Sequence, residues 1–210
     1  MSKIDIIDQL SRDLEPVRPL AKHGKRLGQG LVFCALCCIG LVLTIGLRPD
    51  LGERLQDFSF LFLSVASLAL GVISLDLAVF LRRPGQLSPR QKTRLRMVLA
   101  LWFLAFVLRA MFSDANLSFQ FATEAKCFVL ILATAIAPLF LLRFILWEGA
   151  ITEAKAAGAL LGLASTVIPL AALDWACPHP GLTHLLLGHS LPLFLVSALS
   201  AGLGKVLLRW

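Results

Sequence analysis

The sequence lacks the short motifs that mark the common enzyme classes. It has no glycine-rich phosphate loop and no His-Glu-x-x-His zinc motif. It also has no Ser-His-Asp order and no pair of carboxylates that a plausible fold would bring into a cleft. These absences argue against an enzyme, and we predict no cofactor.

Also missing are low-complexity segments and any soluble domain after the first apolar run. Apolar residues make up 58% of the 210 residues, and the mean hydropathy is +0.82. This apolar share is well above that of a typical soluble domain and indicates a multi-span membrane protein. Because the chain begins with a polar, acidic segment, we predict no cleavable signal peptide.

Six apolar runs are long enough to be considered as membrane spans. We therefore expect an all-α fold, with residues 28–210 forming a six-span transmembrane helix bundle. The third run is the shortest and contains Arg109, and residues 113–126 after it are interpreted as a polar loop. The runs cover residues 28–47, 58–81, 96–112, 127–146, 156–175 and 185–208.

The basic residues predict the orientation of these spans. The net charge of +7 would suit nucleic acid, but Lys and Arg flank the apolar runs, so we predict no direct nucleic-acid binding. Of the 20 Lys and Arg residues, only Arg48, Arg54, Arg109 and Lys126 fall on one side of the membrane. The positive-inside rule then puts both termini in the cytoplasm, which agrees with an even number of spans.

Residues 1–27 form the only long polar segment outside the predicted spans. Apolar residues recur there at helical spacing, acidic residues cover the remaining surface, and Pro16 is expected to end the helix. We predict a short cytosolic amphipathic helix that is disordered, lies on another surface or folds on a partner. The apolar positions are Ile6, Ile7, Leu10 and Leu14, and the acidic ones are Asp8, Asp13 and Glu15.

Three charged residues, Asp76, Arg109 and Asp174, lie near the ends of predicted spans. Such residues are often functional, and in a small transporter or channel, which is the alternative function, they would line a path. We favour a structural role, with Arg109 and Asp174 as a plausible ion pair.

Prolines interrupt only the last three spans, at Pro138, Pro169 and Pro192. Transporters built from inverted repeats break corresponding helices in both halves, so this pattern argues against a transporter. Gly158 and Gly162 form a Gly-x-x-x-Gly face on the fifth span, which favours close packing against another helix.

Cys127 and Cys177 are expected at the outer ends of the fourth and fifth spans, where the environment is oxidising. Two thiols at one depth can form a disulfide if their Cα atoms lie within about 7 Å. Cys177, His179 and His184 also have a Cys-x-His-x4-His spacing that could bind a soft metal. This spacing matches no strict template, and three interfacial histidines, with His189 as the third, are the favoured interpretation.

Several motifs along the whole chain, taken in their order and spacing, resemble those of the NrsF-type membrane anti-sigma factors of proteobacteria. They are Ile6-Ile7-Asp8-Gln9-Leu10, Leu14-Glu15-Pro16-Val17-Arg18-Pro19, Leu47-Arg48-Pro49-Asp50-Leu51, Cys127, Cys177-Pro178, Gly188-His189-Ser190-Leu191-Pro192 and Leu207-Leu208-Arg209-Trp210.

The resemblance implies a six-span protein of the bacterial inner membrane that holds an extracytoplasmic-function sigma factor and releases it under stress, including oxidative or heavy-metal stress. The family's two sensing cysteines match Cys127 and Cys177, and residues 1–27 match the part that contacts the sigma factor. A Pro-His-Pro turn around His179 replaces the more acidic turn of the family. The partners implied are the sigma factor and membrane lipid.

Overall fold

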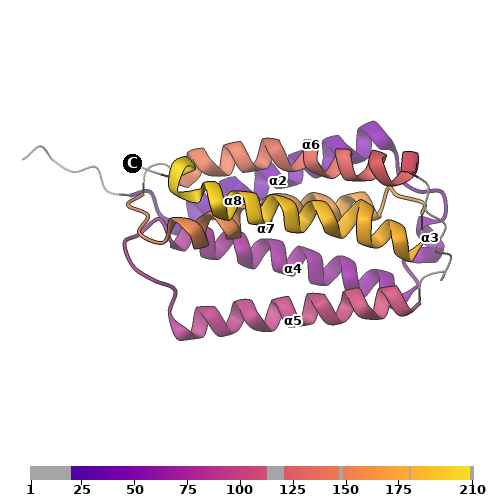
Figure 1. Cartoon of the computed structure of the whole chain (residues 1–210), viewed down its shortest axis with the longest axis horizontal. Helices are drawn as coiled ribbons and strands as arrows, with labels where there is room; N and C mark the ends of the chain where they lie inside the picture. The colour runs from indigo at the N-terminus through magenta and orange to yellow at the C-terminus, as the bar shows by residue number, and fades with distance from the viewer. Residues whose placement is uncertain (1–19, 113–120, 147–148, 180, 209–210) are drawn as a thin grey trace, which may run out of the picture.

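The computed structural model describes residues 20–112, 121–146, 149–179 and 181–208, and this part of the chain contains helices and no strand. The expected all-α class is therefore confirmed (Figure 1). The predicted amphipathic helix, expected to end at Pro16 within the segment of residues 1–27, lies outside the described residues. The helices are α2 (His23–Ile45), α3 (Leu51–Arg54), α4 (Phe58–Phe80), α5 (Pro89–Met111), α6 (Phe121–Leu146), α7 (Ala154–Asp174) and α8 (Leu191–Leu207), and the π-helix η1 (His184–Ser190) precedes α8.

Polar residues at the helix starts explain two of these boundaries. The Asp57 side chain accepts hydrogen bonds from the backbone N–H groups of Ser59 and Phe60, so it caps α4. Ser88 and Gln91 form a capping box at the start of α5. By contrast, the prolines expected to interrupt the fourth and fifth spans, Pro138 and Pro169, lie inside continuous α6 and α7.

Five helices, α2, α4, α6, α7 and the continuous η1–α8 helix, are long and apolar enough to cross a membrane. The predicted third span, residues 96–112, overlaps α5, which begins seven residues earlier and is as long as α2 and α4. However, the first turns of α5 carry Arg90, Lys92, Arg94 and Arg96, and this helix does not meet the same criterion. A sixth span therefore stays a prediction.

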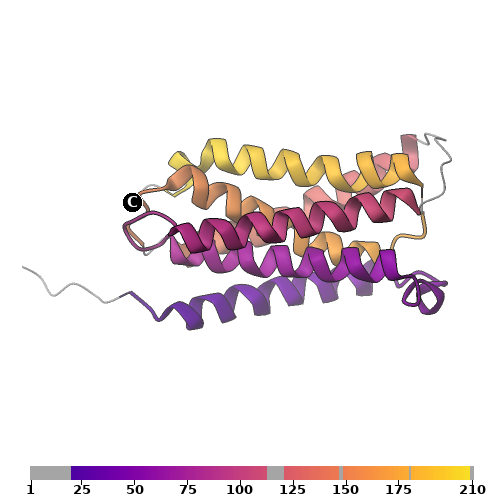
Figure 2. The same cartoon turned by 90° about the horizontal axis from the view of Figure 1, so that it is seen from below.

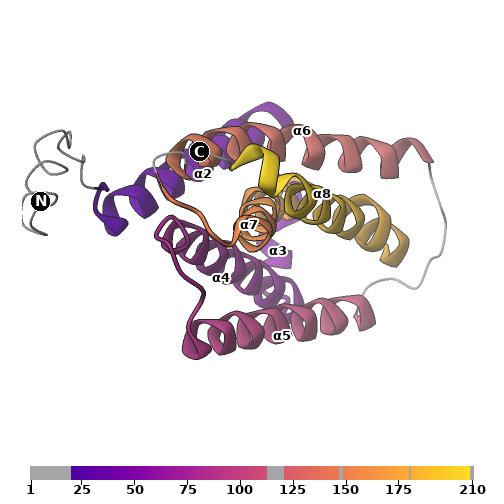
Figure 3. The same ribbon diagram turned by 60° about the vertical axis from the view of Figure 1, so that its left-hand side comes forward.

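The α7 helix lies in the middle of the bundle and packs against α2, α4, α6 and α8 (Figure 3). Most of its residues are buried, whereas most of those of α2 are not. The α5 helix lies at the edge of the bundle, against α4. Any movement of α7 would therefore change its packing against most of the other helices.

The two glycines of the Gly-x-x-x-Gly motif face α8, as their spacing predicted. A Cβ atom on Gly162 would lie 2.8 Å from the Cβ of Ser200, and one on Gly158 would collide with the backbone of Ser200. Only glycine lets the two helix backbones approach this closely.

Both ends of the described chain lie at the same end of the bundle (Figures 1 and 2). The opposite end, called here the α3 end, contains α3 and the turn between α7 and η1. At this end the backbone N–H of Arg48 donates to the carbonyl of Trp175 at 3.1 Å, so the connections after α2 and α7 are joined.

Two expectations about the α3 end are wrong. Residues 121–126, interpreted as loop, belong to α6, where Glu124 in the first turn suits the helix dipole. Arg109 does not form the expected ion pair with Asp174 but donates to Asp57 at 3.2 Å, because the segment after α3 brings the cap of α4 beside it. Asp174 faces His189 instead.

Candidate functional site

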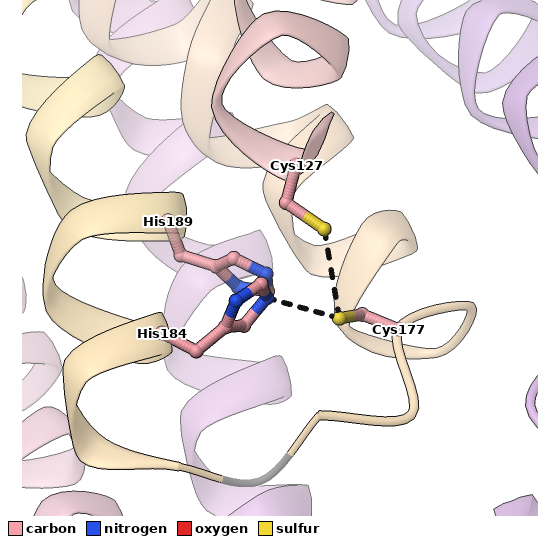
Figure 4. Close-up of side chains that lie close together, drawn as sticks. All are labelled: Cys127, Cys177, His184 and His189. Carbon is pink, nitrogen blue, oxygen red and sulfur yellow. Dashed lines mark hydrogen bonds between the residues drawn. The ribbon is translucent and has the colours of Figure 1, made fainter. Parts of the chain in front are cut away.

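Four side chains, one from α6 and three from the segment that follows α7, meet at the α3 end (Figure 4). Cys127 comes from α6, Cys177 from the turn after α7, and His184 and His189 from η1. One ligand atom of each lies within 4.8 Å of those of the other three, and all four residues are buried. We call these four residues the Cys/His cluster.

The two sulfur atoms of the cluster lie 3.7 Å apart. Both cysteines are free thiols, since a disulfide would bring the sulfurs to about 2.05 Å. The Cys177 Sγ is also 3.1 Å from the Nε2 of His184. The neighbouring Cys127 thiol and burial raise the pKa of Cys177, and the imidazoles of His184 and His189 offset part of this rise.

The π-helical turn places both histidines on one face. In an α-helix with 3.6 residues per turn, residues five positions apart point about 140° away from each other. The wider π-helix brings His184 and His189 together, with ring centroids 4.9 Å apart. The Ser190 hydroxyl donates to the carbonyl of Leu185, five residues back, at 2.9 Å. Isolated π-helical turns of this kind often occur at functional sites.

Gly188 provides the space for the His184 ring within η1. A Cβ atom at this position would lie 3.1 Å from the Cε1 of His184 and 3.3 Å from the Oε2 of Glu124. A larger residue would therefore push the imidazole away from Cys177.

A carboxylate stands behind each imidazole. The Nδ1 of His184 lies 2.9 Å from the Oε2 of Glu124, and the Nδ1 of His189 lies 2.7 Å from the Oδ1 of Asp174. These are close charge contacts rather than well-aligned hydrogen bonds, because the ring N–H directions do not meet hydrogen-bond geometry. A carboxylate at Nδ1 leaves Nε2 free to face the sulfurs.

Two arginines, Arg48 and Arg109, lie beside the cluster, and each forms an ion pair with an aspartate. The guanidinium carbons of Arg48 and Arg109 lie 5.9 and 5.7 Å from the ring centroid of Phe60. Arg48 donates to both carboxylate oxygens of Asp50, at 2.6 and 2.8 Å, and these hydrogen bonds lower the pKa of Asp50. A cavity of about 20 Å³ lies between the arginines and the cluster, with room for about one water molecule or ion.

His179 lies outside the cluster, although its spacing from Cys177 suggested a ligand. Its side chain is exposed, its ring centroid is 5.3 Å from that of His184, and burial of part of the ring lowers its pKa. Of the suggested metal ligands, the structure brings together Cys177 and His184, and it adds Cys127 and His189.

The residues expected to contact a partner lie outside the described residues. They are Ile6, Ile7, Asp8, Leu10, Asp13, Leu14 and Glu15.

The cluster can support two kinds of chemistry. Adjacent thiols can be oxidised to a disulfide, and two sulfurs with two imidazole nitrogens form a donor set suited to a soft divalent cation. The apolar pattern of the sequence carries no sign of η1 or of Glu124, which is why sequence analysis did not find the complete set.

Comparison with known proteins identifies a family. No curated protein and no solved structure matches the chain. The family NrsF, described as "Negative regulator of sigma F", matches residues 10–210, which is nearly the whole chain. The chain therefore belongs to the NrsF family of negative regulators of a sigma factor.

Proposed function

We propose that this chain is an inner-membrane anti-sigma factor that sequesters an extracytoplasmic-function sigma factor and releases it under oxidative or heavy-metal stress. The observation that carries the proposal is the 3.7 Å contact between the thiols of Cys127 and Cys177, at the end of the bundle opposite both ends of the described chain. In a family of negative regulators of a sigma factor, this arrangement separates a sensing end from a partner-binding end.

The distribution of basic residues supports a cytoplasmic position for the termini. The connection between α4 and α5 lies at the same end of the bundle as both ends of the described chain. It contains Arg82 and Arg83, and Arg90 follows in the first turn of α5. The α3 end has only Arg48, Arg54, Arg109 and Lys126, and three of these form ion pairs with Asp50 or Asp57. The positive-inside rule thus turns the Cys/His cluster toward the periplasm.

Residues 1–27 hold the sigma factor in this proposal. Ile6, Ile7, Leu10 and Leu14 anchor an amphipathic helix in an apolar groove of the partner. Asp8, Asp13 and Glu15 then face the basic surface that a DNA-binding protein carries. While bound in this way, the sigma factor is kept from RNA polymerase.

Oxidation changes the α3 end by joining the two sulfurs. With hydrogen peroxide as oxidant, the two thiols lose two electrons and two protons, and an S–S bond forms. The peroxide O–O bond breaks, and the two oxygens take up the electrons and protons to give two water molecules. The S–S distance falls from 3.7 Å to about 2.05 Å, so the bond draws Cys127 of α6 and Cys177 after α7 together and links the two segments covalently. Soft heavy-metal ions would act on the same sulfurs as ligands.

The packing of α7 offers a route from the sulfurs to the partner. Cys177 follows α7 directly, α7 packs against α2, and α2 continues from the N-terminal segment. Release requires that the two states of the bundle differ in affinity for the sigma factor. A difference of about 3 kcal/mol would lower the affinity by more than about 100-fold.

The paired charges give little support to the alternative of a transporter or channel. Asp76 lies 2.8 Å from His23 and 3.4 Å from Arg94, and Arg109 and Asp174 each face a partner of opposite charge or an imidazole. None of the three is left to bind a substrate in the described part of the chain.

The test is a transcription reporter for the sigma factor that co-purifies with the full-length chain. Leu10→Asp with Leu14→Asp should raise transcription without stress, because charged side chains cannot enter an apolar groove. Cys127→Ser with Cys177→Ser should leave transcription low when a peroxide or a cadmium salt is added.

The control variant is Cys34→Ser with Cys37→Ser, which alters cysteines of α2 that lie outside the cluster. It should respond to stress like the wild type. Normal release by the Cys127→Ser and Cys177→Ser chain would contradict the sensing role, and unchanged sequestration by the Leu10→Asp and Leu14→Asp chain would contradict the binding role.

A further inference from the structure

We propose that the Cys/His cluster is a resident binding site for a soft divalent cation of the zinc class, which ties α6, α7 and η1 together. The proposal deepens, and rests on, the sensing site assigned above. In this inference the cluster holds a cation before stress, and the oxidant or heavy metal acts on the cation-bound thiolates rather than on two free thiols.

The donor set is the first argument. Two thiolates and two imidazoles form the Cys2His2 set of tetrahedral structural zinc sites. Two sulfurs bound to a tetrahedral ion at about 2.3 Å lie about 3.8 Å apart. The sulfurs of Cys127 and Cys177 are 3.7 Å apart, and the remaining ligand atoms lie within 4.8 Å of one another. Small side-chain rotations are enough to close this set around an ion.

The surroundings of the imidazoles are the second argument. Metal-bound histidines usually direct the other ring nitrogen to a carboxylate, and here Glu124 stands behind His184 and Asp174 behind His189. The Nε2 of His189 is buried and forms no hydrogen bond with any residue that the structure describes. A buried nitrogen without a partner is costly, and a cation among the four ligands would satisfy it.

The balance of charge is the third argument. Two thiolates neutralise a divalent cation, and the two arginines nearest the site are already paired, Arg48 with Asp50 and Arg109 with Asp57. The cation and its two thiolates together therefore add no net charge to the buried site. All four ligands are protein side chains and all are buried, as expected for a structural site without an open coordination position.

Occupancy has a chemical consequence for sensing. Binding of the cation deprotonates the two thiols, and two protons go to solvent. Oxidation of the two bound thiolates to a disulfide by a peroxide would remove two of the four ligands and release the cation, and a more thiophilic cation can replace it. The two stress signals of the proposed function would then act on one occupied site.

The test uses full-length protein purified in detergent. We expect zinc to co-purify at one ion per chain when metal content is measured by mass spectrometry. After treatment with a chelator, Co²⁺ should restore occupancy with thiolate charge-transfer bands in the near ultraviolet and visible bands of tetrahedral Co²⁺.

Matched histidine variants make the test specific. His189→Ala should lose the stoichiometric ion and change the Co²⁺ spectrum, whereas His179→Ala, five residues before His184 and outside the cluster, should bind as the wild type does. Glu124→Gln and Asp174→Asn keep side-chain shape and all four ligands, and should weaken affinity by about 10- to 100-fold.

Two results would overturn the inference. One is wild-type protein that neither contains zinc nor gives thiolate bands with Co²⁺, and the other is a His189→Ala chain with the metal content and spectrum of the wild type. Metal binding is measured without the sigma factor. A failed reporter test with an occupied site would therefore contradict only the proposed function, and a site that binds no metal in a chain that passes the reporter test would contradict only this inference.

Discussion

At the scale of single residues, Asp57 shows how one side chain can serve a helix and an ion pair. Its carboxylate caps α4 by accepting hydrogen bonds from the N–H groups of Ser59, at 2.9 Å, and Phe60. The same carboxylate accepts from the buried guanidinium of Arg109 at 3.2 Å. Although burial alone would raise the pKa of Asp57, the hydrogen bonds from Ser59 and Phe60 and the charge of Arg109 lower it. Its stabilising effect is therefore lost as the pH falls through the folded-state pKa.

Two substitutions at Asp57 should separate these roles. Asp57→Asn keeps a capping oxygen but leaves Arg109 without its charge partner, and we expect a loss of about 3 kcal/mol in the free energy of unfolding. Asp57→Ala should cost about 1 kcal/mol more, because the cap is lost as well. Denaturant unfolding in detergent measures both, with exposed Glu53→Gln as a control expected to change stability by less than about 0.5 kcal/mol. Equal losses for Asn and Ala would show that the cap contributes nothing.

At the scale of helices, the contact between α7 and α8 depends on glycine. The described bundle is held by a central helix that is buried on nearly all sides, so each neighbour must approach it closely. The space above Gly162 is filled by Ser200 and Ser197, whereas a Cβ atom on Gly40 in α2 would meet no other atom within 4 Å. Two glycines inside helices thus have opposite structural contexts.

Gly162→Ala should destabilise the bundle by about 1–3 kcal/mol, because the added methyl group forces α8 away from α7. Gly40→Ala should instead be neutral or stabilise the protein by up to about 1 kcal/mol, since alanine favours helix more than glycine does. Thermal unfolding of the two variants in the same detergent makes the comparison. Similar shifts in the two melting temperatures would rule out the proposed role of the α7–α8 contact.

At the scale of the whole molecule, the polarity of the bundle is the main functional feature. Both ends of the described chain and the basic connection between α4 and α5 lie at one end, and the Cys/His cluster with its ion pairs lies at the other. The proposed function requires this separation, because it places the sigma factor in the cytoplasm and the signal outside the membrane.

Fusions to topology reporters test this polarity. A fluorescent protein that folds only in the cytoplasm should be active when fused to either terminus, and alkaline phosphatase should be active when inserted between α2 and α4. Activity of alkaline phosphatase at the N-terminus would place the partner-binding segment outside the cell and contradict the proposed function.

The sequence by itself determined the helical class, the approximate positions of the long helices and the close packing at Gly158 and Gly162. These features follow from local composition and spacing, which act over one or two helical turns. It also indicated that Cys127 and Cys177 share one end of the bundle, because both flank the ends of apolar runs.

Only the tertiary structure decided which residues surround those sulfurs. His189 joins His184 because a π-helical turn replaces α-helix at residues 184–190, and Glu124 joins them because α6 begins earlier than its apolar run. Arg109 pairs with Asp57 rather than Asp174 because α5 packs against α4, and Asp57 caps the start of α4. Such contacts depend on backbone geometry and on how separate helices pack. The spacing of residues along one sequence predicts neither of these.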